Sequence, residues 1–133
     1  MTNDSKSRDT TAVIIVDHGS RRDESNSQLV EIVEAYRRHG RWAVVEPAHM
    51  ELAEPSIATA FARCVERGAK FVVVFPYFLA PGTHWSEDIP RLAAEAASPF
   101  PGVRHAVAAP LGIHPLLLQV MDERITEILG GTP

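Results

Sequence analysis

The 133-residue sequence contains a single cysteine, Cys64, which excludes an intrachain disulfide and any cysteine-rich zinc or iron–sulfur site within one chain. It has no excess of positive charge, because 13 Lys and Arg residues stand against 17 Asp and Glu residues, so it lacks the basic footprint of a nucleic-acid-binding protein. No apolar run approaches the roughly 20 residues that a membrane-spanning helix needs. These absences favour a protein of a reducing, cytoplasmic compartment that binds neither nucleic acid nor membrane.

The beginning of the chain is polar and lacks the apolar segment of a secretory signal. We therefore expect residues 1–11 to form a disordered tail. The rest of the chain, residues 12–129, has the length of one domain. Its size is sufficient to bury a hydrophobic core.

Four short apolar runs alternate with four segments in which apolar residues recur at helical spacing. This alternation predicts an α/β fold: a four-stranded parallel sheet with right-handed crossovers and helices on both faces. We expect the strand order 2-1-3-4. The predicted strands are residues 12–16, 42–45, 71–75 and 103–109.

Three details of this prediction can be checked against the structure. Residues 46–54 follow the second strand and are expected to form a loop rich in ionisable side chains. Pro90 belongs in the first turn of a helix, which places the start of the third helix near Asp88 or Ile89, or kinks that helix at its start. The last helix is expected to bury one apolar side, formed by Leu117, Leu118, Met121, Ile125 and Ile128.

Two histidines follow the strands that are expected to lie side by side. His18 comes directly after the first strand and precedes Gly19, and His84 ends the apolar loop after the third strand. In open parallel sheets, ligands bind outside the carboxyl ends of the strands, at the point where the strand order reverses. Neutral imidazole binds divalent Fe, Co, Ni and Zn and accepts a proton near neutral pH. We therefore predict that His18 and His84 together provide metal binding and catalysis; the alternative for His18 is a loop histidine that forms a hydrogen bond to the next helix.

Further side chains near this edge have two interpretations each. Arg21 and Arg22 pair with carboxylates of an anionic ligand, or are solvated surface charges. Tyr77 and Trp85 stack on a flat ligand, or cover the loop.

A cluster after the second strand also remains open. The cluster consists of His49, Glu51 and Glu54. These residues assist His18 and His84 if they reach the carboxyl ends of the first and third strands. Otherwise they are polar residues of a loop and of the start of a helix.

Three segments together resemble a known family: residues 16–21 (VDHGSR), 47–57 (PAHMELAEPSI) and 76–90, which contains Gly-x-His-x-x-x-Asp-Ile-Pro. The family is the class II tetrapyrrole chelatases, specifically the short sirohydrochlorin chelatases of the CbiX/SirB type. The match extends over nearly the whole chain, from about Ala12 to Ile128.

The resemblance implies a lyase that inserts a divalent metal ion into sirohydrochlorin, with Fe²⁺ favoured, in sirohaem biosynthesis. It implies that His18 and His84 are the catalytic histidines, and its motifs add Ser20 and Gly82 to the expected substrate-binding residues Arg21, Arg22, Tyr77 and Trp85. It also implies a homodimer. Some relatives carry a cysteine-rich tail with an iron–sulfur cluster, which we do not expect in a chain with one cysteine.

Alternatives remain open at this stage. One is insertion of Co²⁺ or Ni²⁺ into sirohydrochlorin, as in cobalamin or related cofactor biosynthesis, and another is a non-catalytic module that binds metal or tetrapyrrole. A phosphotransfer protein in which His18 is phosphorylated is disfavoured because the acidic neighbour Asp17 opposes phosphate binding. The sequence leaves open which histidine binds the metal ion and which moves protons.

Overall fold

The computed structural model describes residues 9–80, 82 and 85–130, and only the backbone of Trp85. Within this part of the chain, four strands alternate with four helices. The elements are β1 (Thr11–Asp17), α2 (Asp23–His39), β2 (Val44–His49), α3 (Ile57–Glu66), β3 (Phe71–Pro76), α4 (Trp85–Ala97), β4 (Arg104–Val107) and α5 (Pro115–Leu129). Of the predicted tail, residues 1–8 lie outside the described part, and Thr11 is already the first residue of β1.

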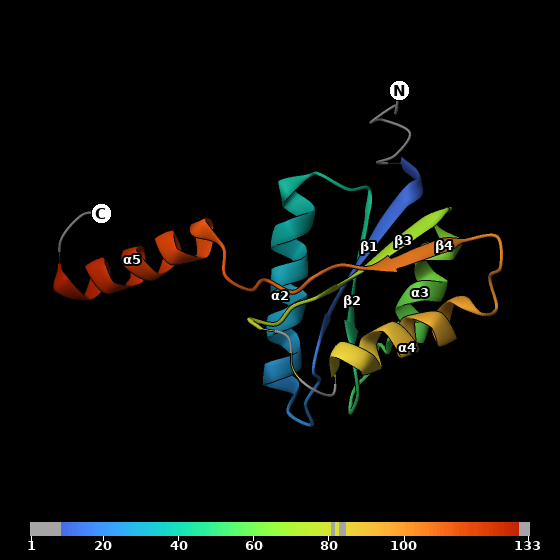
Figure 1. The fold of residues 1–133 in the computed structure, drawn as a ribbon, viewed down its shortest axis with the longest axis horizontal. Coiled ribbons are helices and arrows are strands. Elements are labelled where there is room, and N and C mark those ends of the chain that lie inside the picture. The colour runs from blue at the N-terminus through green and yellow to red at the C-terminus, as the bar shows by residue number, and fades with distance from the viewer. Residues whose placement is uncertain (1–8, 81, 83–84, 131–133) are drawn as a thin grey trace.

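The four strands form one parallel sheet in the order β2-β1-β3-β4, which confirms the predicted topology. Strand β1 lies at the centre and pairs with β2 on one side and β3 on the other. Helix α2 covers one face of the sheet, and α3 and α4 cover the other (Figure 1). The chain therefore leaves β1 and β3 at the same edge of the sheet, since parallel strands end on the same side.

The alternation of side chains along β1 divides the core into two layers. Ala12, Ile14 and Val16 pack with α3 and α4 in the larger layer, where Phe61 and Cys64 of α3 are fully buried. Val13 and Ile15 point to the opposite face and pack against Leu29 and Val33 of α2. Both faces of β1 are thus buried, which explains why its sequence is apolar without interruption.

Two predicted boundaries are wrong. Strand β2 continues to His49, so residues 46–49 are not part of a loop but pair with β1. Helix α4 begins at Trp85 rather than near Asp88, and Pro90 lies inside it. Pro90 is the sixth residue of α4 and lies in its second turn, where it supplies no amide donor for the i−4 carbonyl.

The last helix forms as predicted, but its apolar side is not buried. Helix α5 extends away from the sheet (Figure 1), and none of its residues is buried. Of the five side chains expected inside, Leu117 is half-buried, and the others are exposed: Leu118, Met121, Ile125 and Ile128. The helix leaves the sheet because its N-cap, His114, is fully extended, with φ −143° and ψ 137°. No helix in the described part of the chain is long and apolar enough to cross a membrane.

Candidate functional site

The carboxyl ends of β1 and β2 bring Asp17 and His49 together. These two residues are the last pair in the register of the two strands, and neighbouring residues of a parallel pair project to the same face. The Nδ1 atom of His49 lies 2.6 Å from Oδ1 of Asp17. The imidazole is 2% exposed, so it forms a buried charge-assisted contact beneath the edge of the sheet.

His18 lies one residue beyond this pair, in a much more open position. Its side chain is 56% exposed, and its Nδ1 atom lies 3.5 Å from Oε1 of Glu51, whose side chain is also exposed. The ring of Phe78 meets the imidazole edge-on, with 6.2 Å between ring centroids. One nitrogen of the His18 ring thereby faces a carboxylate. The ring of Phe78, from the segment after β3, packs against the same imidazole.

The backbone holds the His18 and Glu51 segments against each other. The Met50 amide donates to the Asp17 carbonyl at 2.9 Å, and the Glu51 amide donates to the His18 carbonyl at 3.2 Å. These two bonds continue the pairing of β1 and β2 beyond the strands themselves. The spacing between His18 and Glu51 therefore rests on backbone hydrogen bonds as well as on the side chains.

Gly19 permits this close approach. Its φ is +93°, and a Cβ atom built on it would lie 1.8 Å from the Glu51 carbonyl oxygen and 3.1 Å from Cβ of His49. Glycine is therefore required both by the backbone conformation and by the lack of space.

The loop after Gly19 is fixed by Asn26 of α2. Its side chain accepts a hydrogen bond from the Ser20 amide at 3.0 Å and donates one to the Ser20 carbonyl at 2.8 Å. Arg21 and Arg22 follow Ser20 in the chain, and both are exposed.

The three residues predicted to cluster after β2, His49, Glu51 and Glu54, have three different sets of contacts. Glu51 meets His18, and His49 supports Asp17. Glu54 accepts hydrogen bonds from the Ser56 amide at 3.0 Å and the Thr59 hydroxyl at 2.9 Å, so its carboxylate holds the start of α3. These bonds, that from the Ser56 amide first, lower the pKa of Glu54.

Glu46, which belongs to the same predicted loop of residues 46–54, lies apart from these three residues. It is buried within β2 and forms ion pairs with Arg37 at 3.4 Å and Arg67 at 3.7 Å.

The β3 side of the edge is described in part. The Tyr77 amide donates to the Val16 carbonyl at 2.7 Å, so the chain beyond β3 stays beside β1. Tyr77 is partly exposed, and Gly82 is half-buried. His84 lies outside the described residues, directly before the first residue of α4, Trp85. The meeting of His84 with His18 therefore stays a prediction from the strand order.

The site has the chemistry of a metal ligand paired with a proton acceptor. When the Nδ1 proton of His18 is directed to Glu51, the Nε2 lone pair is available for a metal ion or a proton. Among the described residues, no three His, Cys, Asp or Glu side chains form a group that could hold a metal ion. Cys64 is excluded as a ligand because its thiol is fully buried, which raises its pKa to about 12.

Four residues of this site were not selected from the sequence. Asp17 and Phe78 contact the histidines, Gly19 makes room for Glu51, and Asn26 fixes Ser20. Asp17 and Gly19 flank His18 and could have been found from their position alone. Phe78 and Asn26 carry no such signal, since an apolar loop residue and a polar residue in a first helical turn are common.

Comparisons with known proteins agree with this geometry. The sequence profile of the CbiX family matches residues 12–128. The chain is 55% identical over 122 residues to the chloroplastic sirohydrochlorin ferrochelatase of Arabidopsis thaliana, covering 92% of this chain and 54% of that protein. It is 32% identical over 139 residues to the sirohydrochlorin cobaltochelatase of Methanopyrus kandleri, covering 90% of this chain and 97% of that protein.

A solved structure of SirB from Bacillus subtilis with Fe³⁺ superposes with a TM-score of 0.83 at 32% identity, covering 93% of this chain and 48% of that one. The chain therefore spans about half the length of the plant and Bacillus relatives and nearly the full length of the Methanopyrus relative.

Proposed function

Because this chain belongs to the CbiX family, we propose that it is a chelatase, a lyase that inserts a divalent metal ion into sirohydrochlorin. The observation that carries the proposal is the exposed imidazole of His18 at the carboxyl end of β1, held 3.5 Å from the Glu51 carboxylate. Fe²⁺ is the favoured substrate ion, since the Arabidopsis relative is named a ferrochelatase. The product is then sirohaem.

The reaction exchanges two pyrrole N–H protons for one metal ion. Each proton that leaves the macrocycle needs an acceptor, and each bond from the metal ion to water must be replaced by one to nitrogen. His18 supplies an imidazole nitrogen for either task, and Glu51 stabilises the imidazolium that forms when His18 takes a proton. His84 is proposed as the second imidazole, because the segment that carries it leaves β3 at the same edge.

Several further side chains are proposed to bind the substrate. Sirohydrochlorin carries eight carboxylates, and the exposed Arg21 and Arg22, which follow His18 closely in the chain, offer matching charges. Ser20 is held in place by Asn26. On the β3 side, the proposed contacts are Tyr77, Gly82 and Trp85.

We propose different roles for His49 and Glu54. His49 assists through Asp17, which directly precedes His18. Glu54 contributes through the loop that presents Glu51, because its own carboxylate is bonded to Ser56 and Thr59. We propose that the reaction requires no iron–sulfur cluster, since the thiol of Cys64 is buried and protonated.

Cobalt insertion is the second candidate, because the Methanopyrus relative, which matches this chain nearly end to end, is named a cobaltochelatase. Insertion of Ni²⁺ and a non-catalytic module for metal or tetrapyrrole are the remaining alternatives. A homodimer and a cytoplasmic location complete the proposal: one domain leaves the His18 edge open on one side, and a free thiol suits a reducing compartment.

The test is an insertion assay, followed by absorbance, in which excess sirohydrochlorin is offered Fe²⁺, Co²⁺ or Ni²⁺ with catalytic amounts of protein. We expect many turnovers above the spontaneous rate, fastest with Fe²⁺. The variants His18→Ala and His84→Ala should each lose on the order of 100-fold or more of the rate, as expected when a general base is removed.

The matched control is His39→Ala, an exposed histidine at the end of α2 whose removal should leave the rate unchanged. Stoichiometric binding without turnover would instead support the non-catalytic module. Full activity in both the His18 and His84 variants would exclude the proposed roles.

A further inference from the structure

Leu52 combines two unfavourable features in the loop that joins β2 to α3. Its φ is +70°, and within the described part of the chain it is the one residue other than glycine with a positive φ. A positive φ brings the Cβ atom of an L-residue close to the following carbonyl oxygen, so the backbone of Leu52 is strained. Its side chain is also 56% exposed, so burial within the chain does not offset that strain.

Exposure alone would carry no argument. Leu79, in the segment after β3, is 74% exposed without a positive φ, and single exposed leucines of this kind are common. Strain and exposure together are uncommon, and strained residues of this kind cluster at ligand sites. Leu52 therefore indicates a contact with something outside the chain.

The strain belongs to the reversal of the loop. The loop leaves β2 at His49 and returns at Pro55, where the His49 amide donates to the Pro55 carbonyl at 2.8 Å. A residue with positive φ between these two points turns the chain, and glycine would provide that turn without the strain. The turn thus explains the backbone of Leu52 but not its side chain.

The position of Leu52 indicates which contact its side chain makes. The preceding residue, Glu51, is bonded through its amide to the His18 carbonyl at 3.2 Å, and its carboxylate lies 3.5 Å from the His18 imidazole. An exposed apolar residue therefore directly follows the proposed site of metal insertion. A macrocycle that receives a metal ion there carries its carboxylates on the rim and presents an apolar ring face.

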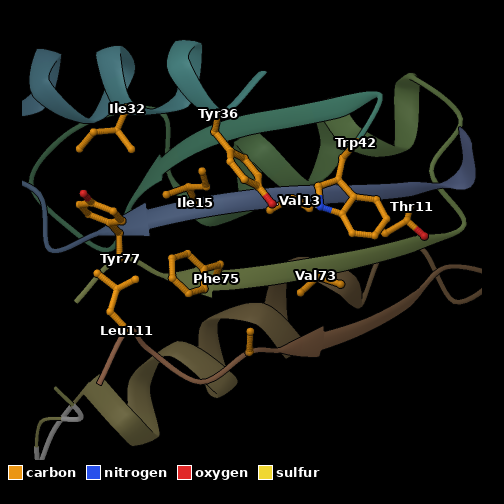
Figure 2. A pocket seen from close by; sticks show the side chains of 11 residues that line it. Thr11, Val13, Ile15, Ile32, Tyr36, Trp42, Val73, Phe75, Tyr77 and Leu111 are labelled. Carbon is orange, nitrogen blue, oxygen red and sulfur yellow. Dashed lines mark hydrogen bonds between the residues drawn. The ribbon is translucent and has the colours of Figure 1, made fainter. Parts of the chain in front are cut away.

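A second apolar surface of the described chain does not meet this requirement. It is a groove of about 420 Å³ between α2 and the β4 side of the sheet, with Val13 and Phe75 on its floor (Figure 2). Neither His18 nor Glu51 lines the groove, and no charged residue of the described chain does. A macrocycle in the groove would lie away from the imidazole and find no partner for its carboxylates.

We propose that Leu52 is a substrate-binding residue whose side chain contacts the apolar ring face of the macrocycle. The inference rests on the proposed chelatase function. A contact of this kind binds substrate and transition state equally, so it lowers KM and leaves kcat nearly unchanged. Because the contact is apolar, salt does not screen it, in contrast to the charge pairing proposed for Arg21 and Arg22.

The test separates the side chain of Leu52 from its backbone. Leu52→Ala removes the apolar surface and keeps the strain, Leu52→Gly removes both, and Leu52→Met keeps an apolar side chain of similar size. Val30→Ala, which shortens an exposed apolar side chain on α2, is the matched control. Insertion rates with Fe²⁺ give kcat and KM, and absorbance titration with sirohydrochlorin in the absence of metal ion gives the Kd.

Leu52→Ala and Leu52→Gly should each raise the KM and the Kd for sirohydrochlorin about fivefold, as expected when the exposed half of a leucine side chain loses its contact. The kcat of both variants should stay within about twofold of the wild type, and Leu52→Met and Val30→Ala should bind like the wild type. The fivefold loss should be the same at low and high salt, whereas the loss in Arg21→Ala should shrink as salt is added.

Urea titrations measure the strain independently of the substrate. Glycine at this position removes the crowding at the cost of some chain entropy, so the folding equilibrium constant of Leu52→Gly should exceed that of Leu52→Ala by about two- to fivefold. If Leu52→Ala fails to fold, as judged by circular dichroism, Leu52→Gly still tests the loss of the side chain.

An unchanged KM and Kd in the variants that lack the leucine side chain would overturn the inference. A loss in Leu52→Met equal to that in Leu52→Ala would also overturn it, because the loop shape would then matter rather than an apolar contact. A lower kcat with an unchanged KM would assign Leu52 to holding Glu51 instead. In each of these cases the wild type still inserts metal, so the proposed function stands. A wild type that neither binds sirohydrochlorin nor inserts metal would refute both.

Discussion

The single residue on which the His18 site depends most is Gly19, which has no functional group. The backbone turns there with φ +93°, and the Glu51 carbonyl oxygen occupies the space in which a side chain would begin. The contact of His18 with the Glu51 carboxylate follows from that close approach. Gly19 can thus be as necessary to the proposed metal-insertion site as His18, the proposed ligand next to it.

Replacing Gly19 by alanine should damage the site more than it damages the fold. Gly68 is a matched control, because its φ is +94° but a Cβ atom there would meet nothing within 4 Å. Gly68→Ala should cost about 1–2 kcal/mol of unfolding free energy from the left-handed conformation alone, with an unchanged insertion rate. Gly19→Ala should cost more in denaturant titrations and lower the rate at least tenfold, since the Glu51 backbone must move. Equal losses of stability and equal rates in the two variants would refute this account.

Burial of Cys64 makes the stability of the protein sensitive to alkaline pH. Its pKa rises from about 9 to about 12 because desolvation disfavours the thiolate. The folded state thus keeps the proton that the unfolded state releases. The contribution of the buried thiol to the free energy of unfolding is therefore complete below pH 9 and is lost as the pH rises towards 12. Between these limits the slope approaches about 1.4 kcal/mol per pH unit.

Urea titrations at pH 8, 9, 10 and 11 measure this contribution when the wild type is compared with Cys64→Ala, which lacks the thiol. We expect the stability difference between the two proteins to shrink with rising pH. A difference that stays constant from pH 8 to pH 11 would show that the thiol does not titrate with folding.

At the scale of elements, the site is built on the pairing of β1 with β2. Asp17 and His49 end that pairing, and the Met50 and Glu51 amides continue it. The Asp17 carboxylate and the His49 imidazole therefore act as a clamp at the open end of the two strands. His18 takes its position from the strand that this clamp holds.

Asp17→Asn should loosen the clamp without removing it. The amide keeps a neutral hydrogen bond to His49 but loses the charge, which weakens the contact by about 1 kcal/mol of unfolding free energy. The insertion rate should fall while the KM for sirohydrochlorin changes little, because Asp17 acts on the position of His18 and not on the substrate. Asp122→Asn, an exposed position on α5, provides the control for the loss of one negative charge. A raised KM with an unchanged rate would assign Asp17 to substrate binding instead.

The elements show what could be predicted from the sequence and what could not. Apolar runs and helical spacing are local signals, and they predicted four strands, four helices and the order β2-β1-β3-β4. The end of β2 was missed because Glu46 and His49 are polar, and their burial depends on the partners Arg37 and Asp17 from other elements.

The same limit applies to α5. Its apolar stripe was recognised, but the sequence does not reveal which surface covers it. The contact of His18 with Phe78 likewise joins two segments that are far apart in the chain.

At the scale of the whole molecule, the proposed homodimer couples folding to association. The apolar side of α5 is exposed in the single chain, so covering it in a pair of chains would make the pair the more stable species. Mass action then requires that stability depend on the concentration of the chain.

The melting temperature should therefore rise with protein concentration. A 100-fold increase in concentration stabilises a dimer by about 2.7 kcal/mol. Two chains of 133 residues unfold with an entropy of about 2.1 cal/mol/K per residue, so the expected rise is about 5 °C. Scanning calorimetry and circular dichroism between 1 and 100 µM would measure this rise, with Ile125→Glu as the control whose melting temperature should stay nearly constant. A wild-type melting temperature that is independent of concentration would refute the proposed homodimer, because a contact between two molecules cannot stabilise them without holding them together.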